Sequence, residues 1–135
     1  MVQVHFEKLK LVPVGYVKTS DSETVIELLP DFTEAAEGLQ EGDWIKLILW
    51  FHRSDTPGRR KVVKVHPHGD PESPIRGVFA TRSPHRPNPV ALYTVRIHDI
   101  EGSRLYVDRI DAIAGTPVID IKIFAKRYDC PEETR

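Results

Sequence analysis

Residues 81–90, TRSPHRPNPV, hold a dense set of side chains that could bind a ligand. The three prolines of this segment fix φ and restrict the residues before them, so the loop would lose little entropy on binding. Arg82 and Arg86 offer planar guanidinium groups that suit a carboxylate or a phosphate. Asn88 can donate to and accept from a base edge or a ribose. The segment predicts a ligand-binding loop; a rigid connection between strands and a polyproline-type ligand (PHRP) are the alternatives.

Histidines upstream of this segment suggest metal chemistry. His66 and His68 are two residues apart in VHPHGD, and His52 and Asp70 are near them in the sequence. Two histidines at this spacing on a strand would share a face and could bind a metal. Pro67 separates them, however, and no second ligand pair has a recognisable spacing. We interpret them as solvated loop histidines and expect no metal.

Positive charge gathers in the middle of the chain. Residues 52–98 hold nine Lys/Arg and three Asp/Glu, a formal charge of +6, which leaves −7 for the remaining residues. Such asymmetry is typical of proteins with a basic face that binds phosphate groups. Folding could instead scatter these charges over several faces.

Several classes of protein are disfavoured by the sequence. The eight glycines form no GxG, and neither GxxxxGK[ST] nor GxSxG occurs, which excludes the commonest nucleotide cradles and the serine elbow. No run of 18 apolar residues and no charged-then-apolar leader is present, so we expect neither a membrane span nor a signal peptide. Cys130 is the single cysteine, which fits a reducing compartment and predicts a cytoplasmic protein.

The elements that must position the loop are mostly strands. Alternating apolar residues predict strands, residues 44–52 are apolar at both parities, and residues 101–103 (EGS) indicate a hairpin turn. Residues 31–39 are the one helical pattern, with Asp31 or Thr33 as N-cap. The predicted fold is all-β: a single domain over 1–135, with about eight mostly antiparallel strands in a small barrel-like curled sheet and one short helix. The candidate strands are 2–6, 11–17, 24–29, 44–52, 61–66, 77–82, 91–100, 104–113 and 118–124.

Two longer runs, GVFATRSPHRPNPV and AGTPVIDIKIF, carry a resemblance to a known family. They resemble the TsaA-like (TrmO-type) family of S-adenosylmethionine-dependent methyltransferases, which act on N6 of threonylcarbamoyladenosine beside the tRNA anticodon. The family's runs read GVFATRSPxRPNPIGLS and DGTPVxDIKPY, matched here from Gly77 through Pro89 and from Gly115 through Lys122. LILWFH is similar to the family's core strand, and the resemblance covers roughly residues 10–125.

The resemblance implies a small barrel-like fold, a homodimer, tRNA as partner, and S-adenosylmethionine bound by both motifs near the subunit interface. The residues that it places at the methyl donor are Arg82, Ser83, Pro84, Arg86, Pro87, Asn88, Pro89, Ala91, Leu92, Gly115, Thr116, Pro117, Val118, Asp120 and Lys122. Candidates for contact with the substrate or RNA are Arg53, Arg59, Arg60, Arg76, His85 and Tyr93. Asp120 is the candidate catalytic base, and Asp120 or Asp111 could meet the donor's cationic groups. A solvated position on an alternating strand is the alternative interpretation of Asp120.

The chain departs from the family pattern after the first motif. Ala91 replaces a glycine, Tyr93 replaces a serine, Ala114 replaces an aspartate and Ile123 replaces a proline. Tyr93 could narrow or stack in the acceptor pocket. These departures favour a retained donor site with an altered acceptor side. A methyltransferase with a small-molecule acceptor and a non-catalytic module for a nucleotide-like ligand are therefore the alternatives to the tRNA enzyme.

Overall fold

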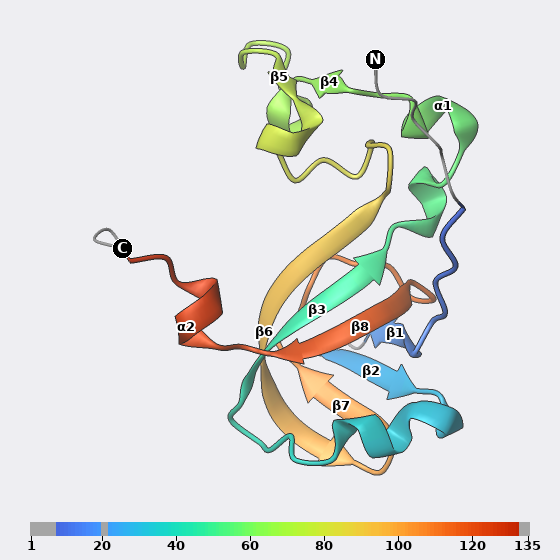
Figure 1. Ribbon diagram of the computed structural model, residues 1–135, viewed down its shortest axis with the longest axis vertical. Coiled ribbons are helices and arrows are strands. Elements are labelled where there is room, and N and C mark those ends of the chain that lie inside the picture. The colour runs from blue at the N-terminus through green and yellow to red at the C-terminus, as the bar shows by residue number, and fades with distance from the viewer. Residues whose placement is uncertain (1–7, 20–21, 133–135) are drawn as a thin grey trace, which may run out of the picture.

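Six antiparallel strands close into a ring around the hydrophobic core (Figure 1). The computed structural model describes residues 8–19 and 22–132 of the chain. Around the ring the strands follow the order β1-β2-β7-β6-β3-β8, and each neighbouring pair is antiparallel. The ring strands are β1 Gly15–Thr19, β2 Thr24–Leu28, β3 Trp44–Trp50, β6 Val90–Glu101, β7 Arg104–Val107 and β8 Pro117–Ile123. The predicted all-β, barrel-like sheet is confirmed.

Alternate residues of the ring strands fill its interior. On β3, Ile45, Leu47 and Leu49 are fully buried, whereas Ile48 and Trp50 on the outer face are half-buried. The inner face of β3 is therefore buried in the core, whereas its outer face is partly exposed within one chain. The core is completed by Val17, Ile26, Leu28, Ala91, Val95, Ile97, Leu105, Val107, Ala112 and Val118.

The ring is not a regular barrel. Two bulges interrupt its registers, one between β3 and β8 near Ile48 and one between β6 and β7 near Ile97. β1 and β8 close the ring through only two residue pairs, Gly15 with Val118 and Tyr16 with Pro117. The β6–β7 hairpin turns at Gly102, whose φ of 56° suits glycine, as its sequence predicted.

A small lobe lies beyond one end of the ring (Figure 1). It contains β4 Lys64–Val65 and β5 Arg76–Gly77, which pair antiparallel, and the helix α1 Pro57–Arg60. The sequence predicted six-residue strands here, but each pairs over only two residues. Proline supplies no backbone donor, and 3₁₀ turns at Pro67–Gly69 and Val78–Ala80 replace the strand ends.

The predicted helix over residues 31–39 is a 3₁₀ helix, Pro30–Ala36, that packs near β8. Its N-cap is Leu29, and the predicted cap Thr33 instead donates to the Leu29 carbonyl at 3.3 Å. The prediction of one helix is also incomplete, because α1, α2 Lys126–Asp129 and a 3₁₀ turn at His52–Ser54 are present. None of the described helices is long and apolar enough to cross a membrane. The candidate strand 2–6 lies outside the described residues.

Candidate functional site

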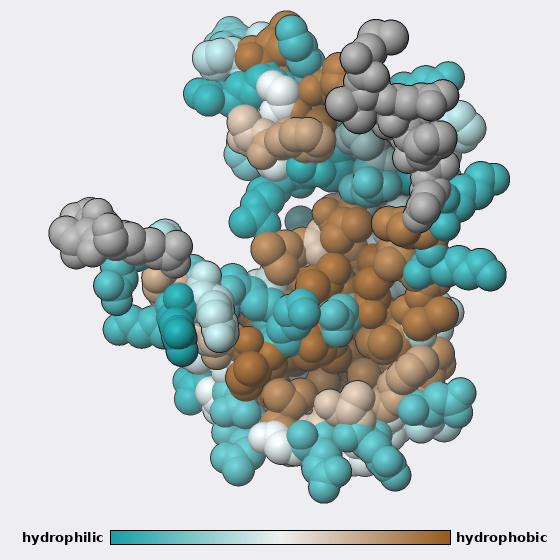
Figure 2. All heavy atoms as spheres, viewed as in Figure 1, coloured by the Kyte–Doolittle hydropathy of each residue, from teal (hydrophilic) through white to brown (hydrophobic). Residues whose placement is uncertain are grey.

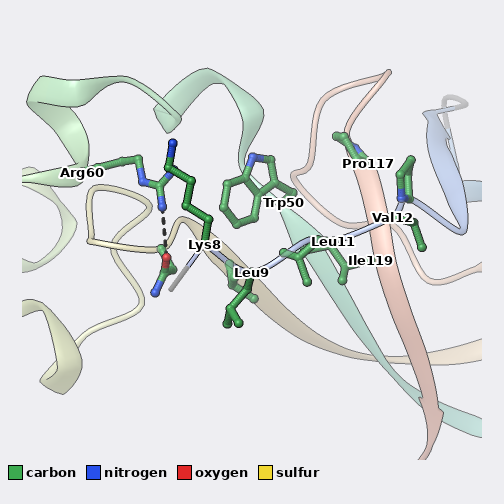
Figure 3. A pocket seen from close by; sticks show the side chains of 11 residues that line it. Lys8, Leu9, Leu11, Val12, Trp50, Arg60, Pro117 and Ile119 are labelled. Atoms are coloured by element: carbon green, nitrogen blue, oxygen red, sulfur yellow. Dashed lines mark hydrogen bonds between the residues drawn. The ribbon is translucent and has the colours of Figure 1, made fainter. Parts of the chain in front are cut away.

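A groove of about 980 Å³ lies where β3, β6 and β8 meet the 81–90 loop, which we call the motif loop (Figure 3). We name it the motif groove because both sequence motifs line it. Most of its walls are apolar, with Trp50 on one side and Arg60 and Asn88 as polar groups. The lining residues are Lys8, Leu9, Leu11, Val12, Pro13, Trp50, Arg60, Asn88, Val90, Pro117 and Ile119.

Arg60 ties the lobe to the motif loop across this groove. Its Nε donates to the Pro87 carbonyl at 2.8 Å, and its Nη2 donates to Asn88 Oδ1 at 3.0 Å, the dashed bond in Figure 3. Its Nη1 pairs with Asp55 Oδ1 at 3.0 Å, and its guanidinium lies 5.5 Å from the centre of the Trp50 ring. The sequence predicted Arg60 as a substrate contact; the structure shows a clamp that orients Asn88 and Pro87.

Arg86 holds the motif loop from within. Its Nη1 donates to the Thr81 carbonyl at 3.2 Å and to the Ser83 carbonyl at 3.1 Å. Its Nη2 donates to the Val78 carbonyl at 3.1 Å. Arg82 is exposed, and its Nη1 approaches the Leu92 carbonyl at 3.4 Å. The two arginines thus differ: Arg86 shapes the loop, and Arg82 is accessible.

The second motif forms the turn that leads into β8. Gly115 has a φ of +90°, and its N–H donates to the Val17 carbonyl at 2.8 Å. The Thr116 hydroxyl is buried and donates to the Ile113 carbonyl at 2.6 Å. Pro117 lines the motif groove, whereas Val118 points into the core. Of these predicted donor-site residues, Pro117 is the one whose side chain the structure places in the groove.

A bulge in β8 determines the face of the strand on which Asp120 lies. Ile48 of β3 is opposite Asp120 while Leu49 is opposite Val118, so Ile119 is an extra residue, and it lines the groove. Asp120 lines a second groove of about 440 Å³ beside the 3₁₀ helix Pro30–Ala36. Its Oδ1 accepts from the Ile121 N–H at 2.8 Å, and Lys122 lies 3.7 Å from its Oδ2. Asp120 and Lys122 are therefore both exposed on the outer face of β8.

The residues that depart from the family pattern differ in their surroundings. The Ala91 side chain is buried in the core, and Leu92 is exposed on the outer face of β6. The Tyr93 hydroxyl donates to Asp111 Oδ1 at 2.6 Å. Burial and the Asp111 carboxylate raise the pKa of Tyr93 above its ordinary value. Tyr93 is thus a neutral donor locked to Asp111.

The substrate candidates fall into two groups. Arg53 and Arg59 are exposed near α1, where Arg59 Nη1 donates to the Arg53 carbonyl at 2.7 Å. Arg76 and His85 line a third groove, of about 810 Å³, between the lobe and the motif loop. The predicted donor residues Arg82, Ser83 and Pro84 also line this third groove.

Sequence reasoning missed several residues of these grooves. Lys8, Leu9, Leu11, Val12, Pro13, Trp50 and Ile119 line the motif groove, and His66 and His68 line the third. Leu9, Leu11 and Val12 are exposed apolar side chains, a pattern that only the structure reveals. Among the residues that the structure describes, no group of three or more His, Cys, Asp or Glu is arranged to hold a metal ion.

Residues 1–130 match the sequence model of a family described as the tRNA-methyltransferase O N-terminal domain. The chain belongs to this family. That match confirms the resemblance seen in the two motifs. Both motifs that line the motif groove lie within the matched residues.

Relatives in the tRNA-methyltransferase O family include archaeal proteins of similar length. A probable S-adenosyl-L-methionine-binding protein of Pyrococcus horikoshii is 65% identical over 128 residues, covering 95% of this chain and 91% of the relative. One of Methanocaldococcus jannaschii is 49% identical, covering 90% of this chain and 97% of the relative. The crystal structure of TrmO from Pseudomonas aeruginosa superposes with a TM-score of 0.69 and 29% identity. The match covers 96% of this chain and 62% of that structure, so this chain spans about three fifths of it.

Proposed function

We propose that this chain is an S-adenosylmethionine-dependent methyltransferase that methylates tRNA, at N6 of the threonylcarbamoyladenosine beside the anticodon. The observation that carries the proposal is that both motifs line one groove. Asn88 of the first motif and Pro117 of the second line it together with Trp50. Family membership and the names of the archaeal relatives support the methyl donor. The altered residues Ala91 and Tyr93 are the reason to test the acceptor separately.

The motif groove suits a donor of this size and chemistry. A volume of about 980 Å³ with apolar walls is in the range that encloses a small organic ligand. Apolar walls would take the donor's adenine and aliphatic carbons, and Lys8, Arg60 and Asn88 provide polar groups. The bound donor would supply a methyl group on a sulfonium. The chain's own task is to hold donor and acceptor in line, because positioning supplies most of the rate in such transfers.

We propose that the protein acts as a homodimer through the outer face of β3, β6 and β8. Apolar side chains gather on this face, as Figure 2 shows over β3 and β8. On this face Leu92 is 44% exposed, and Ile48, Trp50 and Val90 are half-buried beside it. An exposed apolar patch of this kind, bordered by the charged Lys46, Asp120 and Lys122, is typical of a surface that is covered in an assembly.

Asp120 is the proposed base, and it lies on this same outer face, so its role depends on the proposed dimer. Because Asp120 does not line the motif groove of its own chain, it would serve the reaction from the dimer face. If Asp120 is the base, Asp120→Asn lowers kcat and leaves donor affinity unchanged. Unchanged kcat would remove Asp120 from the mechanism. Asp99→Asn, at another exposed aspartate that bonds to the next N–H, is the matched control.

Methyl transfer to tRNA tests the proposed function directly. The purified chain would be incubated with methyl-labelled S-adenosylmethionine and tRNA that carries unmethylated threonylcarbamoyladenosine, followed by nucleoside analysis. We expect label in the N6-methylated nucleoside. Asn88→Ala should weaken donor binding about tenfold, because it leaves polar partners unsatisfied, whereas Gln40→Ala on an exposed loop should not.

The alternatives give different results in the same experiment. Donor binding without a labelled nucleoside, and without salt-dependent tRNA binding, would indicate a small-molecule acceptor. Absence of donor binding in calorimetry would overturn the methyltransferase and leave a binding module.

A further inference from the structure

The third groove is lined by basic side chains of the lobe and the motif loop. His66, His68, Arg76, Arg82 and His85 line it, and no Asp or Glu is among the described residues of its wall. The two acids between β4 and β5 lie outside the wall, and Asp70 Oδ1 accepts from the Glu72 N–H at 3.0 Å. A concave surface with cationic groups of one sign concentrates anions.

Several polar groups of this groove are available to a ligand. No hydrogen bond or ion pair engages the exposed Arg76 side chain within the described ranges 8–19 and 22–132. His66 Nδ1 lies 2.8 Å from the Ser73 carbonyl. Because a carbonyl only accepts, Nδ1 carries the proton, which leaves Nε2 for a second partner. Arg76 therefore offers its guanidinium fork, the form of cation that best fits a phosphate.

An exposed aromatic ring lies directly before the groove wall in the sequence. Phe79 is 85% exposed on the 3₁₀ turn Val78–Ala80, and Ala80, Thr81 and Arg82 follow it into the wall. Ile75, beside Arg76, is 59% exposed. Cationic grooves that carry exposed aromatic rings are typical of surfaces for single-stranded nucleic acid, where phosphates bind the cations and bases stack on the rings. A site for free phosphate would have no use for the exposed ring.

We propose that the third groove binds the phosphate backbone of single-stranded RNA, with Phe79 as a platform for an unstacked base. The inference rests on the proposed tRNA activity and adds where the RNA lies. The motif loop joins the two sites, because Arg82, Ser83 and His85 line the third groove while Asn88 and Val90 line the motif groove. RNA held by the lobe would thus reach the methyl donor across this one loop.

RNA affinity of three variants tests the proposal. Binding of a fluorescent anticodon stem-loop RNA would be followed by anisotropy, and donor binding by calorimetry. We expect Phe79→Ala to weaken RNA binding about tenfold, the loss of one stacked base. Arg76→Gln should weaken RNA binding several-fold and lower the slope of log affinity against log salt by about one. Lys126→Gln, which removes one exposed cation on α2, is the matched control and should change little.

The outcomes separate this inference from the proposed function. Wild-type RNA affinity in both Phe79→Ala and Arg76→Gln, with tRNA methylation retained, would overturn the third groove alone. A wild-type chain that neither binds nor methylates tRNA would overturn the proposed function. Competition by inorganic phosphate is the third measurement. If phosphate displaces RNA while Phe79→Ala leaves RNA affinity unchanged, the groove is a simple anion site and the proposal is wrong.

Discussion

Replacing Arg60 by alanine would separate the lobe from the motif loop. The substitution removes the bonds to the Pro87 carbonyl and to Asn88 Oδ1, together with the Asp55 ion pair and the contact with the Trp50 ring. It therefore acts on the shape of the motif groove as well as on its charge.

The size of the effect follows from these contacts. The half-exposed Asp55 pair is worth about 0–1 kcal/mol after solvent screening. The bonds to Pro87 and Asn88 contribute about 1–2 kcal/mol together, and the ring contact about 0.5–1 kcal/mol. A loss of about 2 kcal/mol from the ordered loop lowers apparent donor affinity by up to about 30-fold, because only the ordered fraction binds.

Donor titration and tryptophan fluorescence would measure this loss. In a Trp44→Phe background, Trp50 is the single remaining tryptophan, so its emission reports the groove alone. Arg59→Ala is the matched control, since Arg59 is on the same helix and its side chain donates to the Arg53 carbonyl, away from the motif loop. We expect Arg60→Lys to be intermediate, because it keeps the charge and loses the fork.

The reasoning would be refuted by one combination of results. If Arg60→Ala binds the donor within about twofold of wild type while the Trp50 emission shifts, the clamp is structural and does not shape the donor site. A fall in affinity for Arg59→Ala equal to that for Arg60→Ala would equally exclude a specific clamp.

Three further predictions concern the loop, the ring and a tyrosine. Arg86→Ala removes three bonds to loop carbonyls and should cost about 2–3 kcal/mol of loop order, seen as faster proteolysis within residues 78–89; unchanged cleavage would contradict it. Gly15→Ala would place Cβ in a clash with the Glu27 carbonyl oxygen of β2, so we expect a loss of about 2–4 kcal/mol in urea unfolding. Gly58→Ala, with nothing within 4 Å, is its control, and equal losses would count against the clash. The raised pKa of Tyr93 means that the folded state favours the protonated phenol, so its stabilising contribution is full below the ordinary value of 10.0 and declines above it. Tyr93→Phe should therefore lose less stability than wild type between about pH 9 and pH 11, and parallel curves would oppose this.

Local patterns in the sequence predicted the ring well. Strands β6 and β8 show apolar residues at alternate positions, and the β6–β7 turn contains a glycine. Both signals involve residues that are close in the sequence, so they can be recognised without the tertiary structure. The short pairing of β4 and β5 was not predicted, because the apolar residues of these segments are typical of longer strands. The neighbouring prolines, which cannot donate a backbone hydrogen bond, limit the length of the pairing. The bulge at Ile119 was likewise hidden, and it turns Asp120 to the outer face of β8, whereas regular alternation from the buried Val118 would place Asp120 on the core side.

The candidate site was predictable in its location and not in its internal contacts. The motif loop was found from its prolines and polar groups, yet Arg60 reaches it from 27 and 28 residues away along the chain. No spacing rule connects residues at that separation outside a regular element. The same limit applies to Arg86, whose residue type suits a ligand while its bonds are to its own loop.

These contacts reduce the number of cations within residues 52–98, a segment of formal charge +6, that are available to bind RNA phosphates. Arg59, Arg60 and Arg86 all donate to backbone carbonyls of their own chain, so part of this charge holds the protein together. Arg76 makes no such bond among the described residues, and it faces the third groove. A salt dependence scaled to nine cations would therefore be too steep, because each internally bonded guanidinium releases fewer counterions when RNA binds. Under the proposed RNA site, substitution of Arg76 should therefore lower the RNA salt slope more than substitution of Arg59 or Arg86, whose guanidinium groups are bonded within the chain.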